Sequence, residues 1–132
     1  LALARENGRR VQGDESVTFL ESDLFSAVTQ SFDLIVANLP YIATTEATEL
    51  SREVQKDPDL ALYGGVKGTE IIARALDEAF PHLNPGGLLA LELGIDQAKE
   101  LATLAEDLGY FPVQIRKDLS GVERFLFATK PA

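Results

Sequence analysis

Hydrophobic and polar positions follow two different periods along the chain. Continuous apolar runs over 33–37 and 88–93 are typical of strands buried in a parallel sheet. Apolar residues three and four apart over 71–80 and 98–108 predict two amphipathic helices. A further helical pattern over 1–10 is expected to end near Gly8.

Shorter segments complete the predicted order. The β-rich run 17–20 predicts a short strand, and 111–117 and 123–129 predict two strands whose short connection demands antiparallel pairing. The polar stretch 43–59 is expected to be a long loop with room for one helical turn.

Proline, glycine and helix-capping residues predict where the helices and turns begin and end. The run 84–87, Asn-Pro-Gly-Gly, predicts a turn. Asp96 is expected to cap the helix that follows it, and Gly109 to end that helix. Pro81 is expected to kink or end the helix before it.

The order is therefore helix, strand, strand, helix, strand, helix, strand, strand. Alternating helices and strands indicate the α/β class with a mostly parallel sheet, and the C-terminal hairpin adds an antiparallel strand. The length of 132 residues suits one domain with its own core. We expect a single domain over residues 1–132.

Composition narrows the function classes. The net charge is −9 and the basic residues are scattered, which argues against binding to a phosphate backbone. The chain has no cysteine, which excludes a thiolate nucleophile or a cysteine-ligated metal and fits a reducing cytoplasm. No apolar run approaches the length of a membrane span. We expect a cytoplasmic protein with no metal and no membrane partner.

The most informative residues follow the strand predicted over 33–37. They are Asn38, Leu39, Pro40 and Tyr41, which combine an amide, a rigid ring and an aromatic face. In open parallel sheets, ligands bind at the carboxyl ends of strands. The combination suits a site that grips a planar nitrogen group for methylation. The same residue types also favour a plain strand-to-loop turn, so the tetrapeptide alone leaves both interpretations open.

Four blocks in this order make the chain similar to the release-factor glutamine N5-methyltransferases, the HemK family. They are 32–42, 60–68, 85–97 and 116–124. The resemblance implies a Rossmann-like class I methyltransferase fold with S-adenosyl-L-methionine as cofactor. It also implies transfer of a methyl group to the glutamine side-chain amide of the Gly-Gly-Gln motif in a peptide chain release factor, the expected protein partner.

The family motif Asn-Pro-Pro-Tyr corresponds to residues 38–41, so the resemblance makes Asn38, Leu39, Pro40 and Tyr41 the catalytic candidates. It implies that Asn38 and the carbonyl of Leu39 hold the substrate amide and that Tyr41 packs on it. Leu39 stands where the family has proline. Since Pro40 already favours extended geometry at the preceding residue, Leu39 can present its carbonyl much as proline would.

The resemblance also implies cofactor contacts. Asp23 would accept from the adenine amino group, Leu24 would pack on the ring or offer its N–H, and Asn38 would lie beside the cofactor. An Asp after a strand is, by itself, more often a turn or cap residue.

The family's glycine-rich cofactor loop and ribose-binding acid have no counterpart in these residues. The glycines of 64–68 are no substitute, since no strand leads into them. We expect a partial domain without the first two strands of the fold and with little activity alone. Its exposed strand edges need the missing half or favour self-association.

Two alternatives remain open. Adenine N6-methyltransferases that act on nucleic acid also carry an Asn-Leu-Pro-Tyr motif, and a truncated interaction module would bind no cofactor.

Three single residues also carry expectations. Glu92 is either close to a ligand or a solvated strand end, Arg124 is expected to pair with Asp118, and His82 is expected at the surface.

Overall fold

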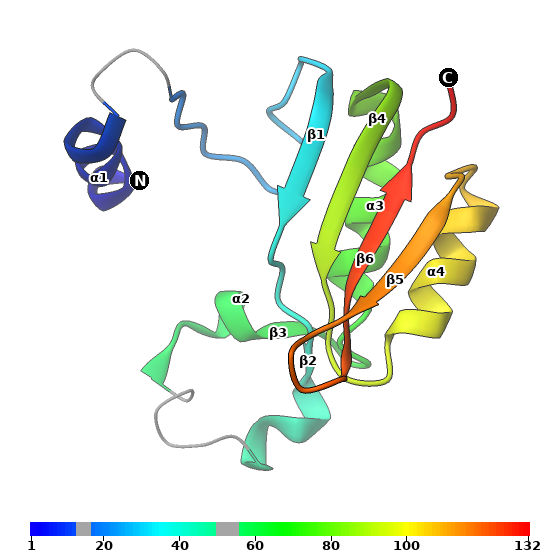
Figure 1. Ribbon diagram of the computed structural model, residues 1–132. Helices are drawn as coiled ribbons and strands as arrows, with labels where there is room; N and C mark the ends of the chain where they lie inside the picture. Colours follow the sequence, from blue (N-terminus) through cyan, green and yellow to red (C-terminus); the bar gives the residue numbers. More distant parts are fainter. Residues whose placement is uncertain (13–16, 50–55) are drawn as a thin grey trace.

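A four-stranded sheet in the order β1-β4-β6-β5 organises the chain in the computed structural model, which describes residues 1–12, 17–49 and 56–132 (Figure 1). β1 (Phe32–Ala37) pairs in parallel with β4 (Leu83–Glu92). β6 (Glu123–Thr129) runs antiparallel to both β4 and β5 (Val113–Lys117). β1, β4 and β5 therefore point the same way, and the predicted mostly parallel sheet with a closing hairpin is confirmed.

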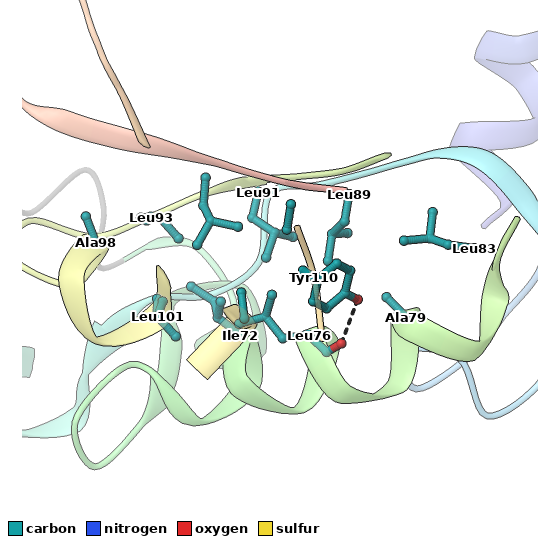
Figure 2. Packing of buried hydrophobic residues seen from close by; sticks show 13 residues of the cluster. Ile72, Leu76, Ala79, Leu83, Leu89, Leu91, Leu93, Ala98, Leu101 and Tyr110 are labelled. Atoms are coloured by element: carbon teal, nitrogen blue, oxygen red, sulfur yellow. Dashed lines mark hydrogen bonds between the residues drawn. The ribbon is translucent and has the colours of Figure 1, made fainter. Parts of the chain in front are cut away.

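Two helices lie together on one face of this sheet (Figure 1). They are α3 (Glu70–His82) and α4 (Ala98–Asp107), close to the ranges that the apolar spacing predicted. Their apolar faces and the facing strand residues form one core, in which Tyr110 is 1% exposed and donates to the Leu76 carbonyl oxygen at 2.8 Å (Figure 2). The core members include Ile72, Leu76, Ala79, Leu83, Leu89, Leu91, Leu93, Ala98, Leu101 and Leu126.

The opposite face of the sheet carries no helix within the described residues (Figure 1). Leu34 is 55% exposed and Val36 is 71% exposed, so the prediction of a buried strand over 33–37 is wrong on this face. The reason is that, among the described residues, no helix packs over this face (Figure 1). β1 is also an edge strand of the four-stranded sheet, with β4 as its one neighbour there. An apolar sequence marks a strand suited to burial but does not supply the partner that buries it.

The remaining elements are short. α1 (Ala2–Gln12) stands apart from the sheet (Figure 1). β2 (Ile42–Ala43) pairs in parallel with β3 (Tyr63–Gly65), flanked by the 3₁₀ helix η1 (Thr44–Glu49) and by α2 (Asp59–Leu62). The expected long loop over 43–59 thus holds short helices at both ends, and its residues 50–55 lie outside the described part.

Three local predictions are wrong. The run 17–20 forms no strand, and none of the strands in the described sheets pairs with it. Helix α1 continues through Gly8, since one glycine costs a helix only about 1 kcal/mol. Asp96 adopts φ +63°, and the cap position of α4 falls on Gln97.

Other boundary predictions are confirmed. Gly109 follows the end of α4 with φ +97°, in the left-handed region that glycine adopts without strain. α3 ends at His82, one residue after Pro81. A fourth prediction is wrong, because residues 84–87 lie within β4 and do not form a separate turn. They mark an irregularity in its pairing, since Phe32 pairs with Leu83 but Leu34 pairs with Leu88. None of the described helices has both the length and the apolar character of a membrane span.

Candidate active site

The tetrapeptide 38–41 lies between the carboxyl end of β1 and the start of β2, and glycine backbone packs against it. A Cβ atom added at Gly64 would collide with the carbonyl oxygen of Pro40, and one added at Gly68 would collide with that of Tyr41. Gly68 also has φ +83°. These two glycines therefore serve close backbone approach, as expected for a turn and unlike a ligand cradle.

Gln97 holds the same segment from the side of α4. Its Nε2 donates to the carbonyl oxygen of Tyr41 at 2.8 Å, and its Oε1 accepts from the backbone N–H of Gly94 at 2.8 Å. One side chain thus ties the loop after β1 to the loop after β4. These loops lie at the carboxyl ends of adjacent parallel strands, where ligands bind in open sheets.

The phenol end of Tyr41 is held by an ion pair. Its hydroxyl donates to Glu92 Oε1 at 3.1 Å. Arg124 donates to the Tyr41 hydroxyl oxygen at 2.9 Å and to Glu92 Oε1 at 3.2 Å, and its guanidinium stands 5.0 Å from the centre of the Tyr41 ring. The Arg124 and Glu92 side chains are only 20% and 29% exposed, so solvent screens their attraction less than that of a surface pair.

This arrangement corrects one expectation and decides between the two interpretations of Glu92 that the sequence left open. Arg124 pairs with Glu92 and not with Asp118, whose carboxylate instead accepts from the backbone N–H groups of Ser120 and Val122 in the β5–β6 turn. Glu92 is half-buried and hydrogen-bonded, not a solvated strand end. Sequence reasoning missed the link between Tyr41, Glu92 and Arg124 because no spacing rule connects residues on three separate elements.

The four sequence blocks of the resemblance meet around one residue. Tyr41 belongs to the first block, Gly68 to the second, Gln97 to the third and Arg124 to the fourth. Each of these contacts or closely approaches the backbone, hydroxyl or ring of Tyr41. The segment 38–41 is therefore fixed by parts of the chain far apart in sequence, as a preorganised site requires.

The cofactor candidates Asp23 and Leu24 sit in a tight turn. The backbone N–H of Ser26 donates to the Asp23 carbonyl oxygen at 3.0 Å, and that of Ala27 donates to Ser22 Oγ at 3.0 Å. Leu24 has φ +46°, a conformation that costs a residue with a side chain about 1 kcal/mol or more. Strained residues of this kind cluster at ligand sites.

A hollow of about 590 Å³ connects this turn to the tetrapeptide. We call it the acidic hollow. Its lining includes Asp23, Leu24, Leu39, Pro40, Leu60 and Ile71. Two cofactor candidates and two catalytic candidates therefore share one concave surface, whose lining combines two acidic residues, Glu21 and Asp23, with two serines and several apolar residues.

Side chains of helix α3 hold the turn around Asp23 and Leu24 in place. Arg74 donates to Asp23 Oδ2 at 3.3 Å and to Glu78 Oε1 at 3.0 Å, and Glu78 Oε2 accepts from the backbone N–H of Phe25 at 3.4 Å. Hydrogen bonds to Glu78 and then to Asp23 raise the pKa of Arg74. The Asp23 side chain remains 73% exposed and open to a further donor. One helical turn after Glu78, the ring of His82 stacks on the ring of Phe25. This histidine is therefore half-buried and packs against the turn.

Asn38 faces a different hollow. It is exposed at the end of β1 and lines a space of about 460 Å³ on the open face of the sheet, together with Glu92, Leu34 and Val36. The structure thus brings Asp23, Leu24, Leu39 and Pro40 into one hollow and sets Asn38 at the edge of another. The segment 38–41 forms the border between the two.

Curated relatives match nearly the whole chain. A release factor glutamine methyltransferase of Deinococcus radiodurans is 40% identical over 130 residues, which cover 98% of this chain and 46% of the relative. The enzyme of the same name from Rhodopirellula baltica is 42% identical over 134 residues, covering 98% of this chain and 45% of the relative. The chain is a homologue of the release factor glutamine methyltransferases. The resemblance drawn from the four blocks is confirmed.

Solved structures agree on the fold. A methyltransferase from Pyrococcus furiosus aligns with a TM-score of 0.55 and 30% identity, over 80% of this chain and 44% of that chain. An O-methyltransferase family protein from Burkholderia thailandensis aligns with a TM-score of 0.60 over 99% of this chain and 41% of its own; at 14% identity it speaks for the fold alone. No protein-family model matches the chain.

These alignments confirm a partial Rossmann-like class I methyltransferase fold. The chain spans about half the length of the curated release factor glutamine methyltransferases that it matches.

Proposed function

We propose that this chain carries the acceptor-binding part of an S-adenosyl-L-methionine-dependent methyltransferase that methylates the glutamine side-chain amide in the Gly-Gly-Gln motif of a release factor. The observation that carries the proposal is the 40% identity, over 98% of the chain, to a relative named as a release factor glutamine methyltransferase. The convergence of the four sequence blocks on Tyr41 supports it.

The acceptor's chemistry explains the residue types. An amide nitrogen is a weak nucleophile because its lone pair is delocalised into the carbonyl. The side-chain oxygen of Asn38 accepts one amide proton, the Leu39 carbonyl accepts the other, and the Tyr41 ring packs on the amide plane. The gain is mostly positioning, which reaches roughly 7–11 kcal/mol in ideal cases. No classical acid–base pair is required.

The acidic hollow fits an adenine ring. Leu24, Leu39 and Ile71 offer apolar surface, and the Asp23 carboxylate offers an acceptor for an exocyclic amino group. Asn38, which lines the neighbouring hollow on the open face of the sheet, would lie next to the methionine portion. When bound, S-adenosyl-L-methionine supplies the methyl group from its sulfonium.

The charge of the chain favours a protein acceptor over nucleic acid. A net charge of −9 repels a phosphate backbone, and the described site residues include the carboxylates of Asp23 and Glu92. A cytoplasmic location is also our proposal and rests on the absence of cysteine from the sequence.

The test uses a chimera in which this chain replaces the matching 130 residues of the Deinococcus radiodurans relative. We expect the chimera to methylate a glutamine of a purified release factor, as located by peptide mass spectrometry. The 132-residue chain alone is expected to be inactive and to show no heat of binding with S-adenosyl-L-methionine.

Two controls decide the acceptor. RNA treated with ribonuclease-free chimera should remain unmethylated, and methylation of the release factor should not depend steeply on salt. Methylated adenine in RNA, with an unmodified release factor, would replace the proposal with the adenine N6-methyltransferase alternative.

A further inference from the structure

Three hydrogen bonds fix Tyr41, one at its backbone carbonyl and two at its side-chain hydroxyl. Its carbonyl accepts from Gln97, its hydroxyl donates to Glu92, and its hydroxyl oxygen accepts from Arg124. The Arg124 guanidinium also stands over the face of the ring, at 5.0 Å from its centre. The ring therefore has one direction in which it can point.

The Arg124 side chain combines two hydrogen bonds from one nitrogen with a guanidinium contact to the Tyr41 ring. The same terminal nitrogen reaches the Tyr41 hydroxyl oxygen at 2.9 Å and Glu92 Oε1 at 3.2 Å while the planar group faces the ring. A lysine ammonium is a point charge on a flexible stem and does not reproduce this planar geometry. Charge alone therefore does not explain the arrangement.

The position of Arg124 links the last strand to the acceptor site. Arg124 lies on β6, and its backbone carbonyl also accepts from the N–H of Leu93, just after β4. Glu92 ends β4, next to β1, which leads into the tetrapeptide. An ordered chain of contacts thus runs from β6 through β4 to the segment 38–41.

We propose that Arg124, together with Glu92, is a positioning residue that sets the Tyr41 ring against the methyl acceptor. This inference rests on the proposed function. Arg124 itself touches neither substrate nor cofactor and acts through Tyr41. Loss of the guanidinium frees the ring, misplaces the acceptor amide and slows methyl transfer while leaving the acidic hollow intact.

The kinetic test compares Arg124→Lys, Arg124→Gln and Glu92→Gln in the chimera with the release factor as acceptor. We expect kcat to fall about tenfold or more, because small misplacements of reacting groups cost rate steeply. KM for S-adenosyl-L-methionine should stay within about twofold, since Asp23 and Leu24 are untouched. Arg116→Lys is the matched control, as Arg116 is exposed on β5 and bonds only to Gln114 among the described side chains.

A double-mutant cycle separates positioning from general stability. If Arg124 acts through Tyr41, the losses in kcat from Arg124→Lys and Tyr41→Phe should combine to much less than their product. Fully multiplicative losses, or an unchanged kcat in Arg124→Lys, would overturn the inference. Assays are run well below the unfolding temperature of each variant.

A measurement on the 132-residue chain does not depend on activity. With ¹³C-labelled tyrosine, the ring signals of Tyr41 should shift or broaden in Arg124→Lys, while those of Tyr63 and Tyr110 keep their positions. If the parent chimera transfers no methyl group, the proposed function fails, and the ring signals alone then test whether Arg124 holds the Tyr41 ring in place. Unchanged Tyr41 signals would overturn it.

Discussion

Gln97 donates from Nε2 to the carbonyl oxygen of Tyr41 at 2.8 Å, across 56 residues of sequence. Its Oε1 accepts from the Gly94 N–H at 2.8 Å, so one amide satisfies two loops at once. The pair joins the loop after β1 to the loop after β4 at the carboxyl edge of the sheet. Removal of this side chain should therefore loosen the site as a whole.

Gln97→Ala should lower the free energy of unfolding by roughly 1–3 kcal/mol, because two half-buried hydrogen bonds are lost and their partners stay behind. Urea unfolding followed by circular dichroism measures the change. Gln114→Ala, at an exposed glutamine of β5, is the control and should remain within about 0.5 kcal/mol. Equal stability of the two variants would contradict the role given to Gln97.

Tyr110→Phe should destabilise the chain by about 1 kcal/mol at neutral pH, because the bond to the Leu76 carbonyl is lost in the core. Tyr63→Phe is the matched control.

Burial, and then the charge of Asp77, raise the pKa of Tyr110 above its ordinary 10.0. Stability that comes from the neutral phenol is thus fully present below pH 10 and is lost as the pH rises toward the higher folded value. Between pH 7 and about pH 11, wild type should lose more stability than Tyr110→Phe, as measured by urea unfolding at each pH. Parallel losses would contradict this.

Glu70 should stabilise the chain above its ordinary pKa of 4.5 and not in strong acid. The backbone N–H of Lys67 donates to its Oε1 at 2.9 Å and lowers the pKa of this carboxyl in the folded state. A lowered pKa means that the contribution is lost as the pH falls through the folded value.

Glu70→Gln should therefore lower the melting temperature at pH 7, with a smaller difference at about pH 3. Glu100→Gln, at an exposed glutamate of α4, is the control. A difference that grows in acid would show that Glu70 acts in another way.

Val36→Lys should reduce self-association of the chain, which we propose to occur through the exposed edge and open face at β1. Val36 is 71% exposed on an apolar strand, and charged edge residues oppose strand pairing between molecules. Sedimentation velocity over a range of concentrations measures the effect. Val11→Lys, at a valine that is 79% exposed on α1, is the control. A wild-type chain that is monomeric throughout would contradict the proposal.

The sequence could predict elements whose signal is local. The helical stripes over 71–80 and 98–108 and the short hairpin connection depend on period and loop length, and both agree with the structure. The strand over 17–20 depended on a neighbour that local sequence does not supply. The apolar run 33–37 likewise could not reveal that β1 lies at an edge with one open face.

For the candidate site, too, the sequence could predict the local feature but not the residues that contact it from other elements. Residues 38–41 stand out because polar, rigid and aromatic groups follow an apolar strand. Gln97, Glu92 and Arg124 act on Tyr41 from other strands and loops, and their roles depend on register: Leu91 pairs with Leu126, which sets Glu92 opposite Phe125 and close to Arg124. Only the folded arrangement brings Arg124, which was expected to pair with Asp118, onto the tyrosine of the motif.

The measurement that tests the account most directly is kcat for release-factor methylation by the chimera with Asn38→Ala, compared with Asn7→Ala at an exposed asparagine of α1. If Asn38 holds the acceptor amide, Asn38→Ala should lower kcat by about 100-fold or more, and Asn7→Ala should leave it unchanged. A kcat for Asn38→Ala within about twofold of the parent would contradict the assignment of residues 38–41 as the acceptor site.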